Sequence, residues 1–299
     1  MKLDGKLAKK IETGDFIVTA ECAPGATAAG ATAEAAFKAL GGRPGAVNVA
    51  DNSHGVALSS VAACVAAIRL GIEPVLQMIT RDRNRIGLQS DLLGAASLGI
   101  RNVLCMSGYH QTLIGCPESA NVFDIDSIQL IELTNRMVEK GLLADGTGID
   151  GPFSMLVGAA ANPFLKPLEL NLLRINKKVE AGARFIQTHA VFDIETFSRW
   201  LDAARKEGLT KKAAILASVF PLDSATEAQM LRDTYAEFCI PDNVIERLKK
   251  AGDNSRKEGS AICVETIKQL KGLDGLRGIH ILSGGREAVV PELTAASGL

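Results

Sequence analysis

The chain has 299 residues, of which 47% are hydrophobic and 22% charged, and its formal net charge is -1 at pH 7. A charge balance this close to neutral does not indicate a basic surface that would bind nucleic acid or an acidic membrane. No apolar run approaches the roughly 20 residues that span a bilayer, and the charged segment 1–16 does not have the pattern of a signal peptide. The six cysteines lack C-x-x-C spacing, so we expect reduced thiols in a cytoplasmic protein rather than disulfides or a zinc site.

Short apolar runs alternate with helical segments along the chain. Most of these runs are almost continuously apolar, as expected for parallel strands that are buried on both faces. The predicted strands are Phe16–Cys22, Ala46–Asp51, Pro74–Ile79, Asn102–Gly108, Ser154–Ala160, Arg184–His189, Ala213–Val219 and Gly278–Ser283.

The segments between these runs are rich in alanine and leucine at helical spacing, and several end in Gly just past a Lys or Arg. Clear examples are 57–71, 88–99, 127–141, 168–182 and 260–272. Eight strand–helix units without a linker predict a single α/β domain over residues 1–299, a (β/α)₈ or TIM barrel. The alternative is a doubly wound open sheet, which would usually have fewer strands or a visible split.

In such a barrel the active site lies at the C-terminal ends of the strands, and the predicted strands end in polar residues. Glu21 is the most informative of these, because it lies inside an apolar strand among small neighbours. Burying a carboxylate is costly and raises its pKa, which would make Glu21 a general acid near neutral pH. The structural alternative is an ion pair with Arg286 or Arg81. The other strand-end candidates are Asp51, Asn52, Thr80–Asn84, Ser107–His110, Asn162, Thr188, His189, Phe220 and Gly284–Arg286.

Three other patterns give weaker signals. The run Thr80–Arg85 would suit phosphates or a substrate carboxylate, but a solvated loop in which Asp82 caps the next helix explains it as well. Gly284 and Gly285 would suit a phosphate site, although they match neither G-x-G-x-x-G nor a P-loop. The histidines and cysteines lack metal-ligand spacing, so no metal site is predicted.

Taken in order, the strand ends resemble the methylenetetrahydrofolate reductase family. The similar segments are VTAECAPG (18–25), 79–104, VGAAANP (157–163), 177–193 and GIHILSGGRE (278–287), which span nearly the whole chain in the family's order. The resemblance implies a barrel that binds FAD at the strand ends. It also implies reduction of 5,10-methylenetetrahydrofolate to 5-methyltetrahydrofolate with hydride from NADH or NADPH.

The resemblance assigns roles to individual residues. Glu21 matches the general acid that protonates N10 as the imidazolidine ring opens to an iminium at N5, to which the flavin N5 then delivers hydride. Arg286 matches a position that meets the folate, where a guanidinium suits the glutamate-tail carboxylates. Three further residues are expected at the substrate: Tyr109, His189 and Glu227. Nine are expected at the cofactor: Asp51, Gln77, Ser107, Phe123, Asp124, Asn162, Asn171, Lys177 and Lys178.

Several positions depart from the family's pattern, and they cluster at the cofactor and the pterin. Tyr109 stands in place of an aspartate at the flavin pyrimidine edge, Gln77 in place of a histidine and Asn171 in place of an aspartate. His189 replaces a glutamine that contacts folate and nicotinamide, and Asn162 replaces a tyrosine. The Tyr109 ring would either raise the reduction potential of the flavin or exclude the flavin altogether.

Three functions therefore stay open. The first is a flavin-dependent methylenetetrahydrofolate reductase, with an electron-transfer protein as its partner. The second is a flavin-free enzyme on the same barrel, which moves a methyl group between tetrahydrofolate and a corrinoid protein or another acceptor, or takes hydride directly from a nicotinamide cofactor. The third is a non-catalytic subunit that binds folate or a partner protein. We also expect a homo-oligomer.

Overall fold

Eight parallel strands close into a barrel in the computed structural model, which describes residues 5–42, 44–235 and 237–299. Each strand pairs with the next along the chain, and β8 returns to pair with β1. The predicted (β/α)₈ barrel is thereby confirmed, and each predicted run contains or overlaps one strand. The strands are β1 (Ile17–Cys22), β2 (Ala46–Val49), β3 (Pro74–Ile79), β4 (Asn102–Met106), β5 (Leu156–Ala161), β6 (Phe185–Ala190), β7 (Ala214–Val219) and β8 (Gly278–Ile281).

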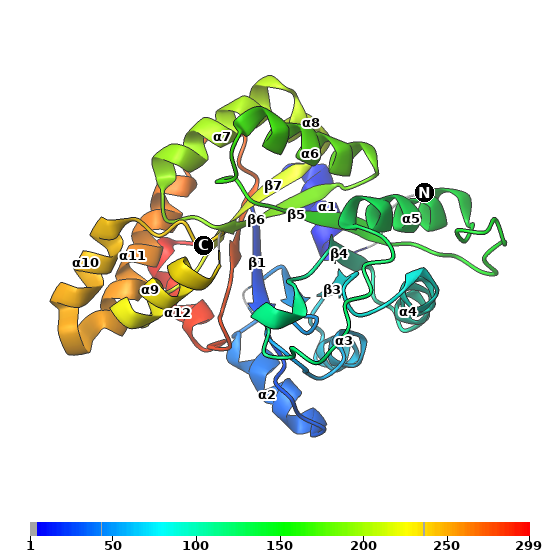
Figure 1. The fold of residues 1–299 in the computed structure, drawn as a ribbon, viewed down its shortest axis with the longest axis horizontal. Coiled ribbons are helices and arrows are strands. Elements are labelled where there is room, and N and C mark those ends of the chain that lie inside the picture. The colour runs from blue at the N-terminus through cyan, green and yellow to red at the C-terminus, as the bar shows by residue number, and fades with distance from the viewer. Residues whose placement is uncertain (1–4, 43, 236) are drawn as a thin grey trace.

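Helices surround the barrel and cover its outer face (Figure 1). One additional helix precedes β1 and another precedes β7. Two more, α9 and α10, form an excursion after β7, in which α9 packs against α10 and α10 packs against α11. The α-helices are α1 (Lys6–Thr13), α2 (Gly30–Ala39), α3 (Ser60–Arg69), α4 (Arg85–Ser97), α5 (Ser127–Lys140), α6 (Leu168–Glu180), α7 (Ile194–Lys206), α8 (Leu209–Lys212), α9 (Ala225–Thr234), α10 (Asp242–Ala251), α11 (Ser255–Leu270) and α12 (Val289–Ser297). Two 3₁₀ turns, η1 (Gln111–Leu113) and η2 (Gly252–Asn254), complete the described elements.

The lower half of the barrel interior is apolar and closed to solvent. Leu7 and Ala8 of α1 pack against the inner faces of the strands and so seal the N-terminal end of the barrel. The ring of Phe185 fills the space beside Gly158, where a Cβ atom would lie 2.2 Å from the ring. This filled interior leaves only the C-terminal end of the barrel open to ligands.

The excursion between β7 and β8 carries a loop to the open end of the barrel. Its helices α9 and α10 have a hydrophobic cluster of their own, built on Leu222, Ile245 and Leu248, and separate from the barrel core. Tyr235 and Phe238, from the segment between α9 and α10, pack against this cluster and also line the cavity described below.

Candidate active site

A cavity of about 680 Å³ opens at the C-terminal ends of the strands. Every strand, or the turn directly after it, contributes to its wall, and α6, α9 and the segment after α9 complete it. About half of the lining residues are polar or charged and the rest are mainly apolar or aromatic, so the cavity can both bury an apolar ligand surface and orient it through hydrogen bonds. The cavity lies where the barrel predicts the active site.

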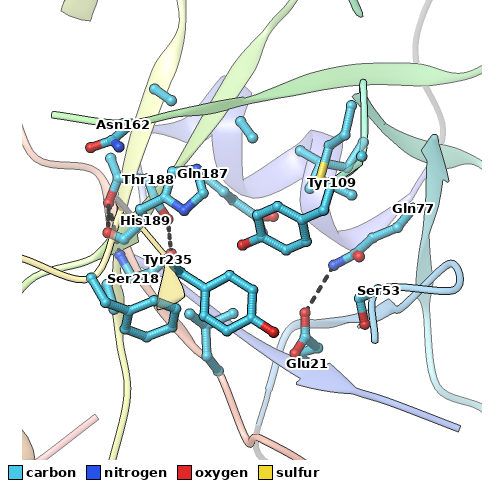
Figure 2. Close-up of a pocket in the computed structure, with 18 of the residues that line it drawn as sticks. Glu21, Ser53, Gln77, Tyr109, Asn162, Gln187, Thr188, His189, Ser218 and Tyr235 are labelled. Carbon is cyan, nitrogen blue, oxygen red and sulfur yellow. Dashed lines mark hydrogen bonds between the residues drawn. The ribbon is translucent and has the colours of Figure 1, made fainter. Parts of the chain in front are cut away.

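Glu21 lies in the wall of this cavity on β1, where Gln77 of β3 holds it (Figure 2). The Nε2 atom of Gln77 donates a hydrogen bond of 3.1 Å to Oε2 of Glu21. Burial raises the pKa of Glu21, the Gln77 bond opposes this, and the charge of Glu287 adds to it. The ion pairs of Arg81 and Arg286 go to other carboxylates, so the structural alternative is wrong. A carboxyl group of this kind can deliver a proton to a bound ligand.

The cavity floor beneath Glu21 is polar but uncharged. Asn48 and Gln187 form a reciprocal amide pair across the barrel, with N···O distances of 2.6 and 3.1 Å. Gln187 also donates to Oγ1 of Thr19, which lies 2.8 Å from Nδ1 of His280. Burial lowers the pKa of His280 to about 3, so its ring is neutral near pH 7. The floor is thus a mutually satisfied network that offers polar atoms without a charge.

Two tyrosines, the only two in the chain, meet over the cavity. The ring of Tyr109 follows Gly108, whose φ of +86° turns the backbone after β4, and lies 5.3 Å from the ring of Tyr235. The Tyr109 hydroxyl donates to the buried carboxylate of Glu237, and burial raises the pKa of that carboxyl. Figure 2 shows both tyrosine rings over the cavity, with Glu21 and His189 to either side. We refer to Tyr109, Tyr235, Phe220 and Phe238 as the aromatic roof.

One face of α6 forms the wall on the far side of the barrel from Glu21. Asn171, Arg174 and Lys178 recur at helical spacing and all line the cavity, whereas Lys177 points to solvent. The Nζ atom of Lys178 donates to the backbone carbonyl of Ala160 at 2.6 Å. Burial, with the neighbouring Arg174 charge, lowers the pKa of Lys178 to about 8.

His189 lies on β6 beside this wall and contributes its ring to the cavity (Figure 2). Burial lowers its pKa to about 4, and the positive charge of Lys178 adds to the effect. The ring is therefore neutral near pH 7 and can both donate and accept one hydrogen bond. A register shift between β6 and β7, from Gln187 to Ala190, sets the backbone beside it.

Arg286 lies behind the cavity wall and is already held by the protein. Its guanidinium forms ion pairs with Asp223 at 2.7 Å and Glu227 at 2.8 Å, donates to the Pro221 carbonyl, and stacks on Phe220. Glu227 lines the cavity, but Arg286 itself does not. The expected contact between Arg286 and the folate tail stays a prediction, and it would require these ion pairs to open.

The charged run after β3 is partly buried: Asp82, Asn84 and Arg85 are exposed, whereas Arg81 and Arg83 turn toward carboxylates of the protein. Arg81 is only 2% exposed and pairs with Asp82, while Arg83 pairs with Asp51 and Asp91. The expected cap by Asp82 is wrong, because Asn84 accepts the backbone N–H groups at the start of α4. Arg81 and Arg83 thus belong to a network of ion pairs beside β2 and β3, and a contact of this run with a phosphate or a substrate carboxylate stays a prediction.

The residues expected at a cofactor divide between the cavity and the surface. Phe123, Asp124 and Lys177 do not line the cavity, and Asp124 instead pairs with Arg85 at 2.8 Å. The remaining six do line it: Asp51, Gln77, Ser107, Asn162, Asn171 and Lys178.

Sequence reasoning missed several residues of the site. Tyr235, Glu237 and Phe238 lie between two helices, where strand-end reasoning does not look. Gln187 belongs to the floor and precedes the predicted end of its strand. Arg174 could have been found, because it lies four residues before Lys178 on the same helical face.

Two features are absent from the described part of the chain. No group of three or more histidine, cysteine, aspartate or glutamate side chains is arranged to hold a metal ion there. Over the same residues, no helix combines the length and the apolar character needed to cross a bilayer.

Comparison with known proteins identifies relatives over nearly the whole chain. The family model for methylenetetrahydrofolate reductase matches residues 6–298. A probable methylenetetrahydrofolate reductase (NADPH) of Caenorhabditis elegans is 22% identical over 267 residues, which cover 87% of this chain but only 36% of that protein. The 5,10-methylenetetrahydrofolate reductase of Salmonella typhimurium is 23% identical over 221 residues, 73% of this chain and 68% of that protein.

Solved structures share the fold at low sequence identity. An uncharacterized protein from Clostridium thermocellum, which binds two copies of 5-methyl-5,6,7,8-tetrahydrofolic acid, superposes with a TM-score of 0.65 at 13% identity and covers 98% of both chains. An F420-dependent secondary alcohol dehydrogenase gives a TM-score of 0.53 at 14% identity over 95% of this chain and 99% of that one.

Proposed function

The chain belongs to the methylenetetrahydrofolate reductase family, and on that premise we propose that it reduces 5,10-methylenetetrahydrofolate to 5-methyltetrahydrofolate. The observation that carries the proposal is Glu21, a carboxyl group with a raised pKa in the wall of a cavity at the strand ends. Its hydrogen-bond partner is a neutral amide rather than a cation, which leaves the carboxyl able to hold a proton.

Glu21 acts as the general acid in this proposal. It donates its proton to N10 of the substrate, the bond between N10 and the methylene carbon breaks with its electron pair passing to N10, and an iminium forms at N5. Gln77 holds the carboxyl toward the cavity and then stabilises the carboxylate that remains. Because the floor below is uncharged, no cation there competes for the developing carboxylate.

The other cavity residues bind and orient the folate. The aromatic roof offers a surface against which a planar pterin can pack, with the Tyr109 and Tyr235 rings 5.3 Å apart. The neutral ring of His189 supplies one donor and one acceptor for the pterin edge. The two loops that meet over the cavity, through Tyr109 and Glu237, would exclude water from the iminium.

The described side chains do not fit a bound flavin. The ring of Tyr109, where the resemblance expects the flavin pyrimidine edge, projects into the cavity and is fixed by Glu237 and Tyr235. Asn171 donates to the carbonyls of Asn162 and Leu165 rather than facing a free site. Gln77 likewise has a protein partner. No step of the proposed reaction is therefore assigned to FAD.

Hydride would instead come directly from a reduced nicotinamide dinucleotide bound as a second substrate. The C4–H bond of the dihydronicotinamide breaks, its hydride forms the new bond to the methylene carbon, and the products are 5-methyltetrahydrofolate and the oxidised dinucleotide. The cavity of about 680 Å³ is of the size typical of small-molecule sites, and its open end would admit the nicotinamide end of the dinucleotide. The reaction thus consumes one hydride from the dinucleotide and one proton from Glu21.

Replacement of Glu21 tests this proposal. Glu21→Gln should lower the turnover of 5,10-methylenetetrahydrofolate with NADH or NADPH by about 10²–10⁴-fold, because the amide cannot supply the proton. The affinity for 5-methyltetrahydrofolate should stay within about threefold. Glu195→Gln, at an exposed position on α7, is the matched control. Turnover in Glu21→Gln equal to that of the control would remove Glu21 from the mechanism.

A second candidate is a flavin-free methyltransferase that moves the methyl group of 5-methyltetrahydrofolate to a corrinoid protein or another acceptor. The observation that favours it is the pair of apolar side chains Leu165 and Met230, which line the cavity and are about half exposed. Apolar side chains exposed at a cavity suit the docking of an acceptor protein. The 5-methyltetrahydrofolate bound by the Clostridium thermocellum protein is compatible with this function too. Methyl transfer without any oxidation of NADH or NADPH would favour this second candidate.

A further inference from the structure

In the part of the chain that the structure describes, six aspartate, glutamate, lysine and arginine side chains line the cavity, and three of them have partners of opposite charge. Asp51 pairs with Arg83, Arg81 with Asp82, and Glu227 with Arg286. Glu21 has a raised pKa and a neutral partner. The other two, Arg174 and Lys178, are cations, and over the described residues neither forms an ion pair.

These two cations lie together on α6. They are four residues apart, which places them about one helical turn from each other on one face. Lys178 is the deeper of the two, half-buried, with one of its three donors used by the Ala160 carbonyl. Arg174 is exposed at the rim, and its guanidinium has no hydrogen-bond partner among the described residues. The charge of Asp126 acts on Lys178 but forms no ion pair with it. Because like charges one turn apart on a helix repel each other, the pair indicates a negatively charged ligand.

The geometry points to the carboxylates of a folate polyglutamate tail as the ligand, and we propose that Arg174 and Lys178 form the subsite that holds them. This inference rests on the proposed function, since it takes the pterin to lie beside Glu21. In a closed ring of eight strands, β1 and β5 lie on opposite sides, and α6 follows β5. A long ligand with its pterin at Glu21 would therefore reach α6 with its other end.

A polyglutamate tail fits this pair for two reasons. First, its carboxylates repeat along an extended chain, and the two cations lie at different depths along a path from the cavity to solvent. Second, the planar guanidinium of Arg174 can hold a carboxylate through two parallel hydrogen bonds, while Lys178 contributes a compact charge. Arg81 and Arg286, the other arginines at or beside the cavity, already pair with carboxylates of the protein.

The test compares the dissociation constants of 5-methyltetrahydrofolate with one and with three glutamates. We expect the wild type to bind the triglutamate about tenfold more tightly. The double variant Arg174→Gln, Lys178→Met should bring the ratio of the two constants close to one, whereas Lys178→Arg should keep it. Lys177→Met, on the outer face of the same helix, is the matched control and should also keep it.

Two outcomes would overturn the inference: the ratio of the two dissociation constants persists in the double variant, or the control variant loses it equally. If the double variant keeps the ratio and also binds NADH or NADPH more weakly, the two cations hold the phosphates of the dinucleotide instead. Failure of the proposed function is distinguishable, because then neither folate binds to the wild type at all. Since Arg174 is exposed, Arg174→Gln alone provides a folded variant should the double variant fail to fold.

Discussion

Glu21 and Gln77 face each other at the strand ends of β1 and β3, with Gln77 Nε2 3.1 Å from Glu21 Oε2. β2 lies between these strands in the barrel, so the contact joins side chains across one intervening strand. A buried carboxyl with an amide partner stays protonated to higher pH than one paired with a cation. The proposed chemistry depends on this choice of partner.

Loss of Gln77 should shift the pH dependence of turnover. The Gln77 amide donates to the ionised form of Glu21 and so lowers the pKa of the carboxyl, in opposition to burial, which raises it. Gln77→Met removes the donor at similar volume, and the pKa of Glu21 should rise further. Because a general acid is lost as the pH passes its pKa, the alkaline limb of the kcat/KM profile should move to higher pH. An alkaline limb that stays in place would mean that another group sets it.

Glu21 should also reduce the stability of the fold as the pH rises. Its pKa is raised in the folded state, so the folded protein binds this proton more tightly than the unfolded chain. The resulting stabilisation is fully present below the unfolded value of 4.5 and is lost as the pH rises through the folded value. Glu21→Gln has no such loss, so its melting temperature should exceed that of the wild type more at pH 8 than at pH 5. Equal differences at the two pH values would contradict this.

Tyr109 should control whether FAD can bind. Tyr109→Asp removes the ring from the cavity and restores the residue type that the family resemblance expects, and it should raise the FAD affinity at least about tenfold. Tyr109→Phe keeps the ring and is the control; FAD should bind it as weakly as the wild type. Fluorescence quenching during titration of the apo-protein would measure both. Weaker or unchanged binding by Tyr109→Asp would count against a blocking role for the ring.

Arg286 should contribute mainly to stability. Arg286→Met leaves Glu227 without its cation and Asp223 with Arg256 alone, and we expect a loss of about 1–3 kcal/mol in the free energy of unfolding. Urea unfolding measures this. Arg205→Met, which removes exposed ion pairs, should change the free energy by about 1 kcal/mol or less. A stable Arg286→Met variant with strongly weakened folate binding would instead support the contact that the family resemblance implies.

The fold could be predicted from the sequence because its signal is local and repeated. Each barrel strand is buried on both faces, so each appears as a short apolar run, and the alternation with helices fixes the parallel topology. Glu21 stood out for the same reason, as a carboxylate inside such a run. The excursion after β7 was the exception, since α9 and α10 have no strand between them to mark their place.

The partners of the site residues could not be predicted in this way. Tyr109 and Glu237 are 128 positions apart, and nothing in the sequence pairs them. The position of Arg286 after β8 predicted a guanidinium that is free to bind the folate. In the structure it already forms ion pairs with Asp223 and Glu227 from the segment after β7. Which of Lys177 and Lys178 faces the cavity depends on the rotation of α6 against the barrel, and a rotation of this kind is set by packing rather than by local sequence.

The measurement that tests the central claim most directly follows the hydride. The purified protein, shown to be free of flavin, would be mixed with 5,10-methylenetetrahydrofolate and NADH or NADPH carrying deuterium at both C4 positions, and the 5-methyltetrahydrofolate would be examined by mass spectrometry. Direct transfer in a cavity without flavin predicts one deuterium in each methyl group formed, and almost no product with Glu21→Gln. A methyl group without deuterium, or no 5-methyltetrahydrofolate from the wild type, would contradict the account.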